Sequence, residues 1–271
     1  MLKEHQQVKK RDEVFAERVT TKIWEEIADE GNPYIASDAR CHGYALTELA
    51  DKSSFIEVLY LLFKGEIPSQ AEAELLEKLM IFLINPGPRH PATRAVMTAA
   101  VSKTYPEHLL PIGLTILGGA HLGAGEIEGA MRFLRKQSKK PPEQVVETLL
   151  STAIRPPEGD WHITPGFGSR YGGIDLMPDK TARSLAALSD EWKILRWGCE
   201  FSSLLAQHKM GWLSTGVAAA AFADLGFQPR VGTGLFQLLS APGLLAHGME
   251  QANKLTTAMP FVKDENYVIE K

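Results

Sequence analysis

Apolar residues recur every three or four positions along most of this 271-residue chain. After Ser54, one face carries Phe55, Val58, Leu59 and Leu62, and a glycine and a proline at 65 and 68 end that run. Alternation with period two, which a half-buried strand needs, is nearly absent; only residues 267–269 hint at it. The sequence therefore predicts an all-α fold.

Prolines, glycines and one capping box divide the rest of the chain into further helices. In the capping box, Ser69 accepts a first-turn N–H and Glu72 reaches back to the serine, so a helix begins there and lasts until the break at 85–88. Pro91 and Pro142 suit the first turns of two more helices, the first ending near 103. We expect others near 126, near 179, over 216–225 and near 243, with a loop-rich stretch over 159–178.

Composition excludes several classes of function. The formal net charge of −4 provides no basic surface for nucleic acid. No apolar run is long enough to span a membrane, and the charged N-terminal segment is unlike a signal peptide, so we expect a cytoplasmic protein. Cys41 and Cys199 are isolated, and no ligand-spaced group of His, Asp or Glu occurs, so we expect neither a disulfide framework nor a metal site.

A glycine-rich segment around His121 is the strongest candidate for a functional site. Residues 117–125 read Leu-Gly-Gly-Ala-His-Leu-Gly-Ala-Gly, and Glu126 begins a helix directly after them. Glycines allow close backbone approach, and a helix N-terminus favours an anion or a developing oxyanion, with His121 as a hydrogen-bond donor. The alternative is tight helix packing around a histidine whose hydrogen bonds are satisfied.

Two further segments depart from routine helix packing. Residues 163–171 read Ile-Thr-Pro-Gly-Phe-Gly-Ser-Arg-Tyr, which fits a contact to phosphate or nucleotide but is not a P-loop, because no Gly-Lys-Ser/Thr follows. A purely structural turn is the alternative. Residues 241–247 read Ala-Pro-Gly-Leu-Leu-Ala-His, a loop entering an apolar helix, where His247 is more typical of a core histidine.

Taken in this order, the segments resemble the citrate synthase and citryl-CoA lyase superfamily. The resemblance runs from about residue 44 to 251 and includes Gly43-Tyr-Ala-Leu-Thr-Glu-Leu49, the stretch 54–68, the histidine segment 118–126, "PGFGSR" at 165–170 and "GLLAHGME" at 243–250. It implies an obligate homodimer of two-domain helical subunits. The large domain would comprise 1–125 and 216–271, and the inserted small domain 126–215. The short length resembles the lyases more than full citrate synthases.

The resemblance also implies roles for individual residues. In the family, an aspartate removes the α-proton of an acyl-CoA, one histidine hydrogen-bonds the enolate, and a second histidine polarises a 2-oxo acid held by arginines. His121 matches the enolate-binding histidine. The matches for the loop that wraps coenzyme A are Thr164, Pro165, Gly166, Phe167 and Gly168, together with Arg170. Coenzyme A would come and go as a thioester substrate, so we expect no tightly bound cofactor.

Other positions depart from the family pattern. Ser169 stands where the second histidine is expected, and Thr215 where the aspartate base is expected. Neither side chain can act as the titrating group at neutral pH. The carboxylate-binding arginines align with Thr181 (or Lys180) and Ser240, and Leu122 replaces a glycine after His121. These changes indicate that the di- or tricarboxylate half of the site is altered while the coenzyme A half is kept.

The sequence leaves three functions open. The first is an enzyme that makes or breaks a carbon–carbon bond of a CoA thioester through an enolate, with a partner other than oxaloacetate. The replacement base would then be His90, Glu126, Asp175 or His208, with His90 preferred because His90-Pro91 resembles the helix entry that lines the family's cleft. The second is a non-catalytic acyl-CoA-binding or regulatory protein of the same fold. The third is an unaltered citrate synthase or citryl-CoA lyase.

Overall fold

A computed structural model of the chain describes residues 15–157 and 159–270. Residues 1–14, which hold much of the charged N-terminal segment, lie outside the described part, as do 158 and 271. The chain divides into two compact units, residues 1–67 and 68–271. Among the described residues, no helix is both long and apolar enough to cross a membrane. The division at 125/126 and 215/216 that the resemblance implies stays a prediction.

The first unit contains a small antiparallel sheet and two helices. Strand β1 (Trp24–Ala28) pairs with β2 (Ala36–Cys41), which pairs with β3 (Tyr44–Ala45), and helices α1 (Leu46–Lys52) and α2 (Phe55–Lys64) follow. Cys41, Leu49 and Leu61 form its buried centre. The sequence did not predict this sheet because nearly every residue of β1 is exposed, so no inward face repeats along it. Gly65 ends α2 as expected, with a φ of 78°.

The second unit is mostly helical, and it contains the other helices that the sequence predicted. Its helices are α3 (Gln70–Leu83), α4 (Pro91–Val101), α5 (Pro106–Leu117), α6 (Ala124–Gln137), α7 (Pro142–Thr152), α8 (Leu176–Ala186), α9 (Lys193–Leu205), α10 (Ser214–Asp224) and α11 (Pro229–Ala252). The strands β4 (Phe167–Gly168) and β5 (Gly211–Trp212) pair antiparallel. The expected capping box at Ser69 is present. The all-α prediction is confirmed, although it omitted both small sheets.

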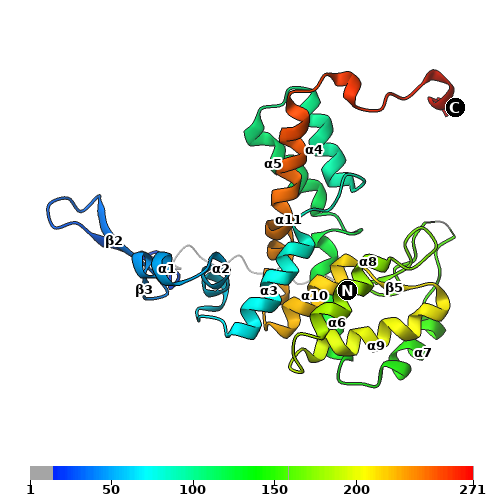
Figure 1. Ribbon diagram of the computed structural model, residues 1–271, viewed down its shortest axis with the longest axis horizontal. Helices are drawn as coiled ribbons and strands as arrows, with labels where there is room; N and C mark the ends of the chain where they lie inside the picture. The colour runs from blue at the N-terminus through cyan, green and yellow to red at the C-terminus, as the bar shows by residue number, and fades with distance from the viewer. Residues whose placement is uncertain (1–14, 158, 271) are drawn as a thin grey trace, which may run out of the picture. The chain divides into compact units, whose positions relative to one another are not determined.

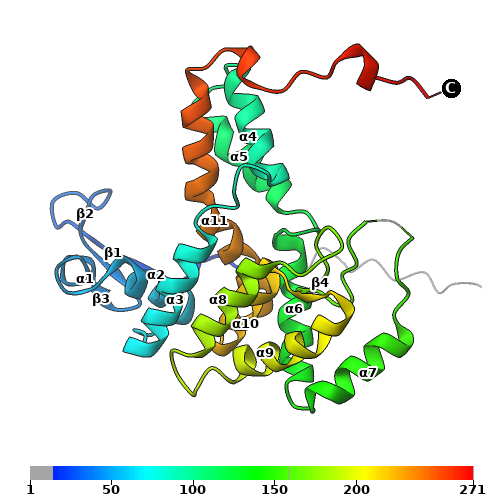
Figure 2. The same ribbon diagram turned by 45° about the vertical axis from the view of Figure 1, so that its right-hand side comes forward.

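Helix α10 lies at the centre of the second unit. Its residues 217–222 are fully buried, as befits a helix that is apolar on every side. It packs against α6 and α9, and α6 in turn packs against α11. Helix α11 then continues to a second group, where it packs against α4 and α5 (Figures 1 and 2). Through α11, the two groups of helices share one continuous element.

Two local predictions were wrong, and one helix was missed. Helix α11 begins at Pro229, not near Gly243, and continues through Pro242. It does so because the N–H of Gly243 donates to the carbonyl of Ile84 at 2.8 Å, in the turn after α3, which satisfies the amide outside the helix. Helix α5, with an internal proline, was not predicted. Residues 267–269 form no strand.

Candidate functional site

The segment 164–168 is a tight turn leading into β4. The carbonyl of Thr164 accepts the N–H of Phe167 at 3.0 Å, with Pro165 and Gly166 between them. Gly166 has a φ of +84°, so proline and glycine occupy the positions that a type II turn prefers. A Cβ at Gly216 would lie 2.0 Å from the carbonyl oxygen of Gly166. Two glycines therefore let this turn rest directly on the start of α10.

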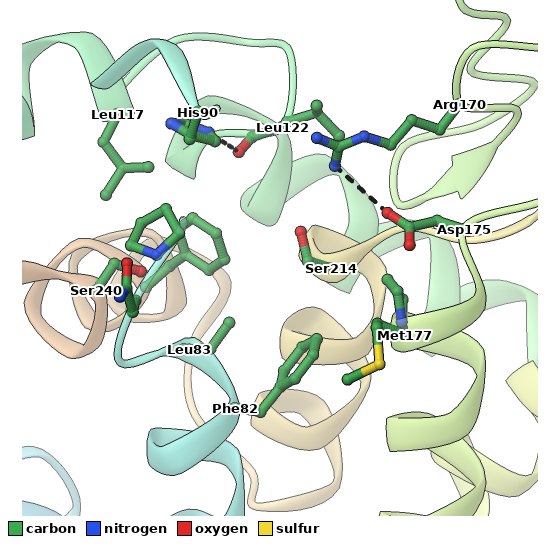
Figure 3. A pocket seen from close by; sticks show the side chains of 14 residues that line it. Phe82, Leu83, His90, Leu117, Leu122, Arg170, Asp175, Met177, Ser214 and Ser240 are labelled. Carbon is green, nitrogen blue, oxygen red and sulfur yellow. Dashed lines mark hydrogen bonds and ion pairs between the residues drawn. The ribbon is translucent and has the colours of Figure 1, made fainter. Parts of the chain in front are cut away.

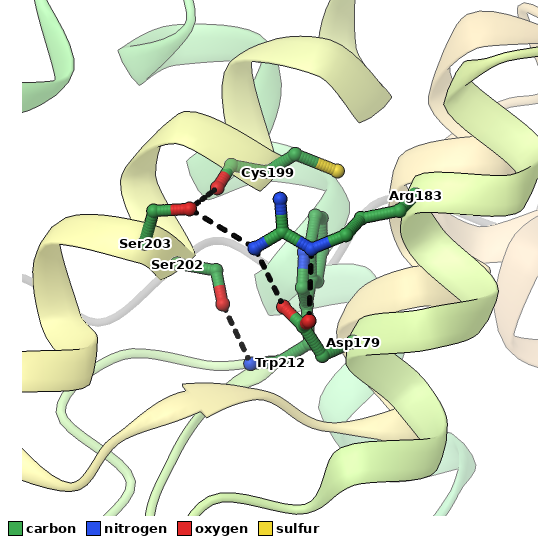
Figure 4. Close-up of polar contacts among 6 residues, drawn as sticks. All are labelled: Asp179, Arg183, Cys199, Ser202, Ser203 and Trp212. Carbon is green, nitrogen blue, oxygen red and sulfur yellow. Dashed lines mark hydrogen bonds and ion pairs between the residues drawn. The ribbon is translucent and has the colours of Figure 1, made fainter.

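Aromatic side chains pack around Phe167, at the end of the turn. The buried ring of Phe167 lies 4.3 Å from that of Trp212 and 4.9 Å from that of Phe201, measured between centroids. Behind it, the N–H of Trp212 donates to Ser202 at 3.2 Å, and Arg183 pairs with Asp179 at 2.9 Å (Figure 4). Arg183 also donates to the hydroxyl of Ser203 at 3.1 Å, so these contacts join β5, α8 and α9 next to the turn.

Glu126 is the polar centre of the region. It lies in the first turn of α6 and is 7% exposed. Its Oε1 accepts hydrogen bonds from Nδ1 of His162 at 2.9 Å and from the N–H of Gly166 at 3.0 Å. Its Oε2 accepts from the hydroxyl of Thr215 at 2.5 Å. One carboxylate thus ties together α6, the 164–168 turn and α10.

The surroundings of Glu126 keep it ionised. Burial raises the pKa of this carboxyl, but the hydrogen bonds from His162, Thr215 and the N–H of Gly166 together outweigh burial, so its pKa falls below the ordinary 4.5. The N-terminus of α6 favours the same negative charge. At neutral pH the group is a carboxylate that can only accept hydrogen bonds.

His162 connects this carboxylate to His121. The two imidazole rings meet edge to face with centroids 5.1 Å apart. His121 is exposed, in the turn that precedes α6, and the side chain of His162 is 13% exposed. Among the described residues, Nε2 of His162 has no hydrogen-bond partner, whereas its Nδ1 is held by Glu126. A row of polar groups therefore runs from buried Thr215 to exposed His121.

A pocket of about 150 Å³ opens beside this row (Figure 3). Leu122 and Ser214, the chain neighbours of His121 and Thr215, both line it. Most of the other lining residues are apolar: Phe82, Leu83, Pro86, Leu117, Met177, Pro178 and Phe236. Its charged lining residues are Arg170 and Asp175, which pair with each other at 3.4 Å (Figure 3). The lining carries no net charge when His90 is neutral.

His90 holds one wall of the pocket. As the N-cap of α4, it accepts the N–H of Ala92 at Nδ1 (3.2 Å). Its Nε2 therefore carries the proton and donates to the carbonyl of Leu122 at 3.2 Å (Figure 3). Burial lowers the pKa of His90, and nearby Arg170 lowers it further. Leu122 itself has a φ of +55°, a left-handed conformation that is rare for leucine.

Known protein structures identify the fold of this chain. No family model and no curated protein sequence matches the chain. Citryl-CoA lyase from Hydrogenobacter thermophilus matches with a TM-score of 0.75 and 23% identity, over 93% of this chain and 94% of that one. The chain has the citrate synthase fold. Sequence resemblance predicted this fold, and the structural match confirms it.

Two longer proteins share the citrate synthase fold with this chain. ATP citrate lyase from Methanothrix soehngenii, in complex with citrate and coenzyme A, matches with a TM-score of 0.67 and 18% identity, over 93% of this chain and 44% of that one. Citrate synthase from Thermoplasma acidophilum, in a ternary complex with carboxymethyl coenzyme A and oxaloacetate, matches with a TM-score of 0.60 and 18% identity, over 80% and 57%. This chain spans about half the length of each.

The residues singled out in the sequence fall into separate places within this citrate synthase fold. Glu126, Thr215 and Gly166 meet in one cluster. Arg170, Asp175, His90 and Ser240 line the pocket of Figure 3. Ser169 accepts the N–H of Trp161 at its Oγ and lines a different hollow, together with His208. Thr181 and Lys180 lie on α8 and line neither space.

Sequence reasoning missed His162. It stands two residues before the recognised turn, in a stretch without periodicity, and its partner Glu126 is 36 residues away. The available signal was a histidine adjoining a glycine-rich loop that already resembled a ligand-binding segment.

Proposed function

We propose that this protein forms or cleaves a carbon–carbon bond of a CoA thioester through an enolate, with a partner other than oxaloacetate. The thioester half of the site would comprise His121 as donor to the enolate oxygen and the 164–168 turn with Arg170 as the coenzyme A contact. The fold supports this assignment, because the ATP citrate lyase structure holds citrate and coenzyme A and the citrate synthase structure holds carboxymethyl coenzyme A and oxaloacetate.

The lining of the Figure 3 pocket supports a partner other than oxaloacetate. Ser240, at a position where the resemblance expects an arginine, is 1% exposed and offers only a hydroxyl. His90 is neutral, so Arg170 is the single cationic side chain among the described residues of the lining, and it already pairs with Asp175. Two or three carboxylates in such a pocket would lack partners, which is costly. A 2-oxo monocarboxylate or an uncharged ketone or aldehyde fits better.

Thermal melting tests the two halves of the site separately. Coenzyme A and acetyl-CoA should raise the melting temperature, because a ligand that binds only the folded state stabilises it. Citrate and oxaloacetate should leave it unchanged. Equal stabilisation by citrate would contradict the altered pocket, and no shift with any CoA compound would contradict the proposal as a whole.

A turnover assay then separates an enzyme from a binding protein. Acetyl-, propionyl- and butyryl-CoA are each mixed with pyruvate or 2-oxobutanoate, and formation of the hydroxyacyl-CoA product is followed by mass spectrometry. His121→Ala should reduce the rate at least about 100-fold, the range for one oxyanion donor, whereas His108→Ala, at an exposed position of α5, should not. Binding without turnover would instead indicate the acyl-CoA-binding alternative. The homodimer and the cytoplasmic location stay predictions.

A further inference from the structure

We propose that His162 is the general base of this site, held in place by Glu126 and Thr215; this inference rests on the proposed function. The sequence offers His90, Glu126, Asp175 and His208 as replacements for the aspartate that the resemblance expects at Thr215. Thr215, at that position, donates its only hydroxyl proton to Glu126 and is completely buried. His90 has both ring nitrogens engaged with backbone groups. Burial keeps Thr215 from a substrate, and His90 has no lone pair left for a substrate proton. Asp175 is already paired with Arg170 at 3.4 Å, and His208 lines a different hollow.

Glu126 determines which nitrogen of His162 is basic. Because the carboxylate can only accept hydrogen bonds, the bond of 2.9 Å requires the proton of His162 to be on Nδ1. The neutral ring therefore carries its lone pair on Nε2. A carboxylate behind a histidine also stabilises the imidazolium that forms when Nε2 takes up a proton. Glu126 and Thr215 are positioning residues here, and His162 is the catalytic residue.

The fold places His162 beside the position of the missing histidine. Residues 161 and 169 form a short ladder: the N–H of Ser169 donates to the carbonyl of Trp161 at 2.9 Å, and the N–H of Trp161 donates back to the Ser169 hydroxyl at 3.2 Å. Across this ladder, a Cβ on Gly168 would lie 2.9 Å from Cα of His162. His162, on the segment next to Gly168 and Ser169, thus contacts the ring of His121.

The resulting reaction balances without a further reagent. Nε2 of His162 takes the α-proton of the thioester, and the C–H electron pair becomes an enolate whose oxygen accepts a hydrogen bond from His121. The enolate carbon bonds to the carbonyl carbon of the partner, and the partner's oxygen becomes an alkoxide. That alkoxide takes the proton back from the imidazolium, so His162 ends neutral. Cleavage is the same sequence in reverse.

Deuterium exchange tests the assignment. Acetyl-, propionyl- and butyryl-CoA are incubated in D₂O, alone and with pyruvate or 2-oxobutanoate, and α-deuterium is measured by mass spectrometry. His162→Asn keeps an N–H donor toward Glu126 but lacks the second nitrogen. It should lower exchange about 10²- to 10⁴-fold, the usual contribution of a general base, with coenzyme A affinity within about threefold. His108→Asn is the matched control and should exchange normally.

Chemical rescue separates a base from a merely structural histidine. In His162→Ala, added imidazole should restore part of the exchange, whereas pyrazole, a ring of the same size that is a much weaker base, should not. Wild-type exchange that persists in His162→Asn, or loss that imidazole does not rescue in a variant that still binds coenzyme A, overturns the role of His162 alone. Absence of wild-type exchange with every mixture overturns the proposed function, and this assignment with it.

Discussion

At the scale of single residues, the hydroxyl of Thr215 stabilises the site through one hydrogen bond to Glu126. Its side chain has almost the same shape as valine, and nothing about its burial requires a polar group. What requires the hydroxyl is Oε2 of Glu126, 2.5 Å away. The sequence resemblance showed that the expected aspartate is absent here. It could not show that the carboxylate of Glu126, from another helix, faces the threonine.

Thr215→Val should lower the free energy of unfolding by about 1–3 kcal/mol, because it leaves a buried carboxylate oxygen without a donor. Thr215→Ser keeps the donor and removes one methyl group, so its cost should be about 1 kcal/mol. Urea denaturation of both variants measures the difference. A serine variant as unstable as the valine variant would show that packing, rather than the hydrogen bond, is what matters.

At the scale of secondary-structure elements, the contact between the 164–168 turn and α10 depends on two glycines that touch. A side chain at Gly216 meets the carbonyl of Gly166, which is backbone and cannot move aside cheaply. Gly234 is the opposite case within α11: it is exposed, and a Cβ there meets nothing within 4 Å.

Gly216→Ala should therefore destabilise the protein by at least about 2 kcal/mol, since overpacking forces the backbone to shift. Gly234→Ala should stabilise it by about 0.5–1 kcal/mol, the difference in helix propensity. Differential scanning calorimetry of the two variants checks both signs. Equal effects would mean that the turn and α10 are not in contact.

Helices with strong end signals could be predicted from the sequence, and those without could not. Ser69 with Glu72 and Pro142 begin helices as expected. Pro242 predicted a break, but α11 continues because an amide finds its partner outside the helix, at Ile84. The site divides similarly: Glu126 was a candidate in the sequence, whereas His162 emerges only when distant segments meet in space.

At the scale of the whole molecule, buried carboxylates determine how stability depends on pH. The pKa of Glu126 is lowered by folding, so its contribution is present above the unfolded value near 4.5 and is lost as pH falls through the folded value. Asp224 acts in the opposite sense. Burial raises its pKa to about 6, although two backbone N–H donors act to lower it. The protonated form is therefore favoured by folding, and the stability that it contributes is lost as pH rises from about 4 to 6.

Comparing Glu126→Gln with wild type isolates the first effect, because Asp224 is common to both. The variant should be less stable at pH 7 by about 2–3 kcal/mol, the cost of weakening charged buried hydrogen bonds. The difference should shrink as pH falls from about 4.5, the unfolded value, through the lower folded value, where wild type loses the charge that the variant lacks. Guanidinium denaturation from pH 3.5 to 7 measures it, and a difference independent of pH would contradict the assignment.

The bond between His90 and Leu122 gives the molecule a built-in spectroscopic reporter. A ring proton buried against a backbone carbonyl exchanges slowly with water, and the lowered pKa keeps the imidazole neutral at pH 7. Its proton resonance should lie apart from those of exposed histidines. Because Leu122 also lines the pocket, any ligand that moves that wall changes the resonance. Occupancy of the pocket can thus be followed without a label and before any substrate has been identified.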